Sequence, residues 1–161
     1  MKLSTLLSFG VIAGFVAINP ASAQTATQTV TFQVTAINQI AVTGSPSLVI
    51  NAAAAGSAPT AVTASGNSWS VTTNQSGASI TASIPSAMPA GLTLSANLTA
   101  PAGATSTGLT ALGTTAVNVV TGITKLNSAS LGLSYQLDAT AAAGVISSAT
   151  RVVTYTITGG V

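Results

Sequence analysis

The chain has 161 residues, of which three are Lys or Arg and one is Asp or Glu, and it contains neither His nor Cys. This composition excludes His- and Cys-based catalysis, thiolate metal sites and hydrolysis by a pair of carboxylates. Apart from Lys2, the charged residues are Lys125, Asp138 and Arg151. Two cations in this later part of the chain are too few to neutralise the phosphates of a nucleic acid. A Ser–Lys dyad at Lys125 is formally possible, but a solvated surface Lys is the commoner role. We therefore expect a protein that is not an enzyme, with no catalytic, cofactor-binding or metal site.

The first 23 residues have the three parts of a secretory signal peptide. Lys2 supplies the positive charge, an apolar stretch runs from Leu6 to Ile18, and Ala21-Ser22-Ala23 is a small-residue cleavage site. The alternative is a membrane anchor, but the stretch is shorter than the roughly 20 residues of a spanning helix. We predict cleavage after Ala23, secretion to the cell surface or medium, no later membrane span, and one domain over residues 24–161.

The scarcity of charge indicates self-association. The mean hydropathy is +0.66 and the formal net charge is only +2. Net charge keeps soluble proteins apart, and values near zero favour association. Such a surface suits a protein that is covered by identical neighbours.

The first predicted element, residues 28–43, alternates with a period of two, as a half-buried strand does. The apolar positions share one parity, and the other parity is mostly Thr and Gln. At roughly 3.3 Å per residue the element would reach about 50 Å, well beyond an ordinary strand of about 5–6 residues. It is either two strands with a bend near Asn38 or one strand that extends beyond its own domain. The apolar positions are Val30, Phe32, Val34, Ala36, Ile40 and Val42.

Shorter strands follow, separated by turn signals. After Gly44-Ser45-Pro46 we predict a short strand at 48–50 and a loop at 52–66. Alternation at 69–73 and 78–84, around the turn 74–77, predicts a hairpin. Further strands are expected at 92–98, 115–123, 131–137 and 153–157, and residues 139–148 are the connection most open to a helical turn.

Seven to nine short strands with regular turns indicate an all-β protein, an antiparallel β-sandwich. Trp69 shares its parity with Val71, which favours a core position; the alternative is an exposed ring that stacks on a sugar. Asp138 and Arg151 end facing strands and are either a pair across the loop or two independent surface charges. The residues expected to be mostly buried are Phe32, Trp69, Val71, Ile80, Leu94, Leu133, Tyr135 and Tyr155.

Two stretches resemble a known family. Residues 28–37 and on to Val42-Thr43 resemble the first strand of spore coat protein U-like and related fimbrial-subunit domains. Ala143-Gly144 through the Val/Thr run that ends at Ile157 resembles their terminal strand. The resemblance implies a secreted immunoglobulin-like sandwich whose subunits polymerise when the N-terminal strand of one completes the sheet of the next.

We therefore expect a structural subunit of an extracellular filament, pilus or coat, with itself as the main partner and cell-surface or matrix components as further ones. The assembly strand would carry Val30, Phe32, Val34, Ala36, Ile40 and Val42. Strand addition supplies backbone hydrogen bonds for affinity and side-chain pockets for register. Two alternatives stay open: the segment is the first strand of its own sandwich, or the protein is a monomeric adhesin or carbohydrate-binding module.

Overall fold

A computed structural model describes residues 22–161, so the predicted signal peptide lies almost entirely outside the described residues. Residues 34–161 form one compact unit, in which nearly all the regular secondary structure is strand. Its one helical element is a short 3-10 turn, Ala141–Ala143. The strands are β1 (Asn38–Thr43), β2 (Val62–Thr73), β3 (Ala78–Ser83), β4 (Leu92–Leu98), β5 (Thr105–Ser106), β6 (Thr110–Ala111), β7 (Val117–Ile123), β8 (Leu126–Ala139) and β9 (Thr154–Thr158).

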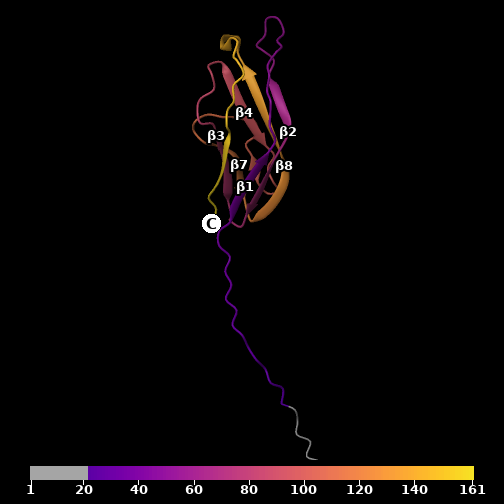
Figure 1. Cartoon of the computed structure of the whole chain (residues 1–161), viewed down its shortest axis with the longest axis vertical. Helices are drawn as coiled ribbons and strands as arrows, with labels where there is room; N and C mark the ends of the chain where they lie inside the picture. Colours follow the sequence, from indigo (N-terminus) through magenta and orange to yellow (C-terminus); the bar gives the residue numbers. More distant parts are fainter. Residues whose placement is uncertain (1–21) are drawn as a thin grey trace, which may run out of the picture. The chain divides into compact units, whose positions relative to one another are not determined.

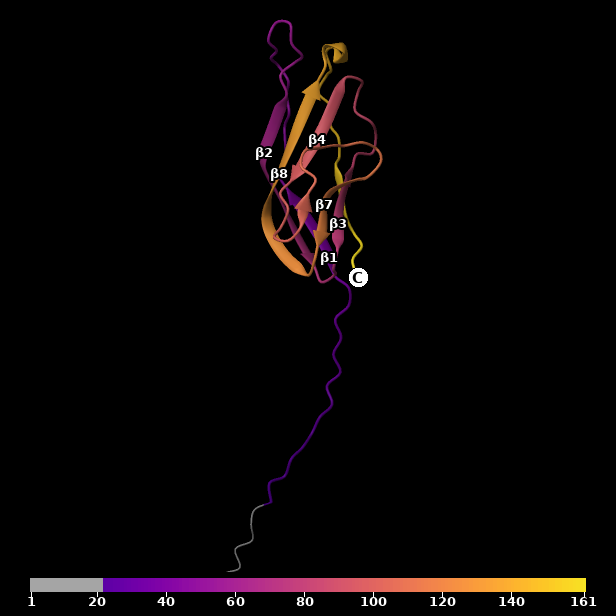
Figure 2. The same ribbon diagram turned by 180° about the vertical axis from the view of Figure 1, so that it is seen from behind.

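The strands form two antiparallel sheets, which confirms the predicted all-β, sandwich-like class. One sheet has the order β1-β2-β8-β4-β6 and the other the order β5-β7-β3-β9. Figures 1 and 2 show the two sheets from opposite sides. The short strands β5 and β6 lie at one edge of each sheet, and β9 and β1 lie at the other.

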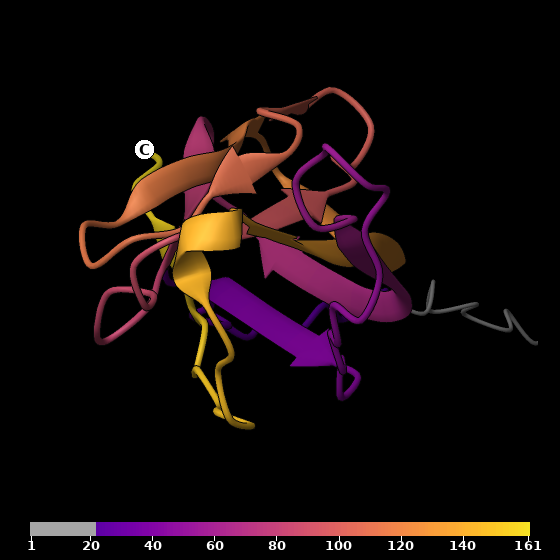
Figure 3. The same ribbon diagram turned by 90° about the horizontal axis from the view of Figure 1, so that it is seen from above.

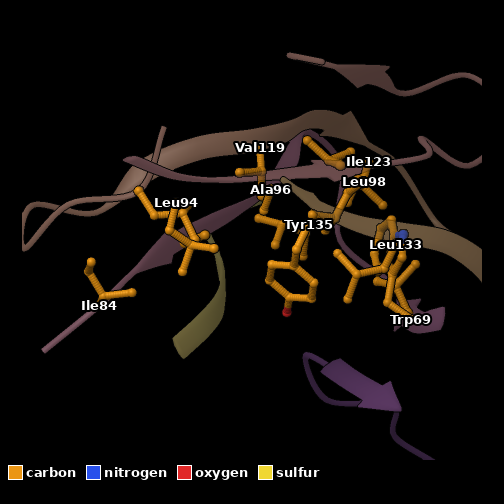
Figure 4. Packing of buried hydrophobic residues seen from close by; sticks show 14 of the residues in the cluster. Trp69, Ile84, Leu94, Ala96, Leu98, Val119, Ile123, Leu133 and Tyr135 are labelled. Carbon is orange, nitrogen blue, oxygen red and sulfur yellow. The ribbon is translucent and has the colours of Figure 1, made fainter. Parts of the chain in front are cut away.

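The core lies between the sheets and is built by the period-two pattern. In β3, Ala78, Ile80 and Ala82 are buried, while the Ser and Thr residues between them face outward and are only half-buried. Figure 4 shows side chains from both sheets meeting in this core. The predicted burial of six residues is confirmed: Trp69, Val71, Ile80, Leu94, Leu133 and Tyr135.

The predicted hairpin at 69–84 is wrong. Residues 74–77 do form the turn, but β2 pairs with β1 and β8, whereas β3 pairs with β7 and β9 in the other sheet. The turn therefore crosses between the sheets. A period of two fixes which face of a strand is buried, but it does not fix the neighbouring strand. The strand predicted at 48–50 is absent too. These residues lie in a loop, from which Leu48 packs against the core.

The longest strand, β8, defines the two ends of the compact unit. Leu126 pairs with Thr73 at one end, and Leu137 pairs with Val62 near the other. We call the end of β8 at Leu126 the base and the end at Ala139 the tip. The turn 74–77 lies at the base, where the backbone of Ser76 exchanges two hydrogen bonds with that of Val161, of 3.0 and 3.1 Å. Figure 3 views the unit from the tip.

Candidate assembly site

The N-terminal segment, residues 22–37, is not a strand in this chain. It forms no sheet pairing, and three of its four large apolar side chains are mostly exposed: Val30 by 73%, Phe32 by 90% and Val34 by 79%. The predicted burial of Phe32 is therefore wrong for the single chain, and the predicted strand begins at Asn38 instead of residue 28. The alternation is nevertheless that of a strand, so the segment has the pattern of a strand without its partner.

The remaining predicted assembly residues behave differently. Ala36 is exposed in the same non-strand segment. Ile40 and Val42 belong to β1, where they lie opposite Val71 and Trp69 of β2. Ile40 is half-buried against the core, whereas Val42 is 46% exposed. The structure thus divides the six residues into an unpaired group before Asn38 and a paired group after it.

Asn74 fixes the backbone where these two groups meet. Its side-chain carbonyl accepts a 2.8 Å hydrogen bond from the Ile37 backbone N–H, and its Nδ2 donates a 2.7 Å bond to the Thr35 carbonyl. Its own backbone N–H donates to the Ile37 carbonyl at 3.2 Å. Sequence reasoning missed this role, because Asn74 was only recognisable as a turn residue.

On the side of the sandwich formed by β1 and β9, each sheet ends in a free strand edge. Among the described residues β1 pairs only with β2 and β9 only with β3, and β1 and β9 contact each other across the gap between the sheets. Each therefore presents a row of unpaired backbone N–H and C=O groups, which is a template for another strand. The inward apolar side chains on this side are only half-buried: Ile40, Val153, Tyr155 and Ile157.

Two tyrosines meet behind this side. The Tyr155 hydroxyl donates a 3.0 Å hydrogen bond to the Tyr135 hydroxyl. In Figure 4 the Tyr135 hydroxyl points away from the surrounding aliphatic side chains. Burial raises the pKa of Tyr135, and the hydrogen bond from Tyr155 partly opposes that rise. Burial raises the pKa of Tyr155 strongly, and its hydrogen bond to Tyr135 adds to the rise. Both rings therefore stay neutral well above neutral pH and close the core at this edge.

The three charged side chains of the compact unit are dispersed. Asp138 accepts two hydrogen bonds from Gln136 Nε2, of 3.0 and 3.1 Å. Arg151 donates to the carbonyls of Thr150 and Ala87, so each of these two side chains has its own partners. Lys125 lines a shallow hollow of about 300 Å³ at the base. Within residues 22–161 no three acidic, His or Cys side chains gather as a metal site would require.

The aromatic residues offer little surface for a flat ligand. Trp69 is 1% exposed, and its indole N–H donates a 3.2 Å hydrogen bond to the Thr99 carbonyl. The predicted core position of Trp69 is thus confirmed, and it cannot stack on a sugar. Tyr135 is 8% exposed, which leaves Phe32 as the one fully accessible ring in the described part of the chain.

Comparisons with protein-family models, with curated proteins and with solved structures found no match to this chain. Over residues 22–161, the structure has no helix with the length and apolar character needed to cross a membrane.

Proposed function

We propose that this protein is the structural subunit of an extracellular filament, pilus or coat, and that it assembles by adding its N-terminal segment as a strand to a neighbouring copy. One observation carries the proposal: the same chain holds an unpaired strand pattern with three exposed apolar side chains and a sandwich side with a free edge and half-covered core. The segment has no partner strand, and the free edge has no neighbouring strand, among the described residues.

The sheet order supports an immunoglobulin-like reading of this fold. The order β1-β2-β8-β4 corresponds to strands A, B, E and D of that fold, and β3 and β9 correspond to C and F. In a complete immunoglobulin-like domain strand G pairs with strand F, and no described strand occupies this place beside β9. A donated segment would take the place of strand G. This is the arrangement implied by the resemblance to spore coat protein U-like and fimbrial subunits.

The direction and register of the added strand follow from β9. Every strand pair in the compact unit is antiparallel, and an antiparallel pair is the more stable kind. Inward positions must face inward positions, because a slip of one residue turns the apolar set outward. The register that places all three large exposed side chains opposite inward residues pairs Val30 with Ile157, Phe32 with Tyr155 and Val34 with Val153.

Burial of the donated side chains drives the addition. Each large apolar side chain that leaves water contributes about 1.5–3 kcal/mol, and Phe32 has the most to gain because it is 90% exposed. Ordering the segment opposes this term. Backbone pairing along the free edge of β9 adds affinity and fixes the register.

A matched pair of charge substitutions tests the proposal. Phe32→Asp places a carboxylate where the neighbour's core needs an apolar ring, so polymers measured by light scattering and electron microscopy should be lost while the circular dichroism of the fold is unchanged. Thr31→Asp adds the same charge on the opposite, outward parity and should leave polymers intact. Equal polymerisation of the Phe32→Asp variant and the unaltered chain would sink the proposal.

A further inference from the structure

We propose that subunits in this polymer also contact each other end to end, with the tip loop of the acceptor seated in the hollow at the base of the donor. The tip loop is the stretch 143–153, which follows the 3-10 turn. The occupant is thus a second copy of this chain. The inference rests on the proposed strand addition and deepens it by naming the surface that surrounds the added strand.

Chain direction brings these two ends together. β9 pairs with β3 so that Thr154 lies opposite Ser83 and Thr158 opposite Ser79, which sets β9 running from tip to base. A segment antiparallel to β9 runs from base to tip and reaches Val153 with its residue Val34. The donated strand therefore leaves the acceptor at the end of β9 that faces the tip, beside the tip loop.

A short tether then fixes where the donor's own compact unit begins. Only residues 35–37 separate Val34 from the first residue of β1, Asn38. Three residues span at most about 10 Å. Asn74 already holds Thr35 and Ile37 by hydrogen bonds at the base of the donor. The base of the donor must therefore lie close to the acceptor's tip loop, which leads from the tip into β9.

The two facing surfaces are both apolar. Val145 is 104% exposed and Val152 is 69% exposed in the tip loop, and Ile146 is 38% exposed beside them. The hollow at the base, of about 300 Å³, is lined by Ile37 and Leu126 together with Lys125 and small polar residues. Ile37 is 40% exposed and continues directly into the donated segment. A Val or Ile side chain of the tip loop would lose its exposure in this hollow.

Hydrogen bonds and close packing fix both ends of the tip loop. The Thr140 backbone N–H donates to the Gly91 carbonyl at 2.9 Å, and Gly91 packs so closely on Ala143 that a side chain at position 91 would clash. At the far end of the loop Arg151 Nη2 donates to the Ala87 carbonyl at 3.3 Å. The loop is therefore fixed at both ends, and Val145 lies between these two fixed points in the sequence.

The test compares a peptide with a whole subunit as the incoming strand. The acceptor is the full chain from Gln24 with Phe32→Asp, which cannot donate. Its partners are a synthetic peptide of residues 24–37 and the unaltered chain from Gln24, held below its polymerisation concentration. Only the unaltered chain carries a folded compact unit, and hence the hollow at its base, next to the donated segment. It should bind about tenfold or more tighter than the peptide, and adding Val145→Asp to the acceptor should remove this advantage without changing peptide binding.

A control substitution and two outcomes decide the inference. Leu109→Asp alters another exposed apolar residue, near β5 and β6 on the other side of the sandwich, and should leave both affinities unchanged. Peptide and chain binding equally, or a Val145→Asp acceptor that keeps the full advantage of the chain, would overturn the end-to-end contact while strand addition stands. A peptide that does not bind at all would overturn strand addition itself.

Discussion

Tyr135 and Tyr155 couple stability to pH through their shared hydroxyl hydrogen bond. Both pKa values are raised in the folded state, so the folded chain holds its phenolic protons more tightly than the unfolded chain, whose tyrosines titrate near pH 10. Their contribution to stability is therefore fully present below about pH 10 and is lost as pH rises toward the folded pKa values.

Chemical denaturation between pH 7 and pH 11.5 measures this effect. The free energy of unfolding should be level up to about pH 9.5 and then fall. These two are the only tyrosines in the chain, so the variant Tyr135→Phe with Tyr155→Phe should fall much less steeply. An equally steep fall in that variant would mean that another group controls alkaline unfolding.

Gly91 is the second residue on which local structure depends. Its φ of +79° is a conformation that favours glycine, and an added Cβ would lie 2.8 Å from the Ala143 backbone nitrogen. Gly103 has a similar φ of +81° but open space around it. We expect Gly103→Ala to cost about 1 kcal/mol in thermal or urea unfolding and Gly91→Ala clearly more. Equal costs would show that the contact at position 91 yields freely.

At the scale of the elements, the sequence predicted strands better than their partners. Alternation located β3, β4, β7 and β9 to within a few residues, because half-buried strands must alternate. It could not reveal that the turn 74–77 joins two different sheets. Nor could it separate residues 28–37 from β1, because an unpaired strand and a paired one share the same pattern.

The N-terminal segment gives the element-scale prediction. Deleting residues 24–36 removes no strand of the compact unit, so the shortened chain should remain folded and monomeric. Circular dichroism at high dilution should match that of the Phe32→Asp variant, and light scattering should show no polymer. Unfolding of the shortened chain at high dilution would mean that the segment belongs to its own core.

For the whole molecule, the proposed assembly of identical copies would explain both the scarcity of charge and the free edge at β9. A soluble monomer normally protects edge strands and carries charge, whereas this chain has few charges and leaves the edges of β1 and β9 free. Charge scarcity and the 28–43 pattern could be read from the sequence. The position of β1 and β9 as edge strands on one side of the sandwich could not, because it depends on which strands become neighbours.

If the strand beside β9 comes from another copy, engineered disulfides should link the two copies, and the chain has no native Cys to interfere. Val34→Cys and Val153→Cys are made in separate chains, which are mixed and oxidised. Directly opposed residues of an antiparallel pair lie about 4.5–5.5 Å apart between Cα atoms, which suits a disulfide.

Strand addition should give a mixed disulfide between the two kinds of chain, formed in step with polymerisation and absent when the Val34→Cys chain also carries Phe32→Asp. A mixture of Val34→Cys with Val49→Cys is the control, since Val49 is 65% exposed and lies outside the proposed register. Mixed disulfide at no more than the level of this control would contradict strand addition between copies.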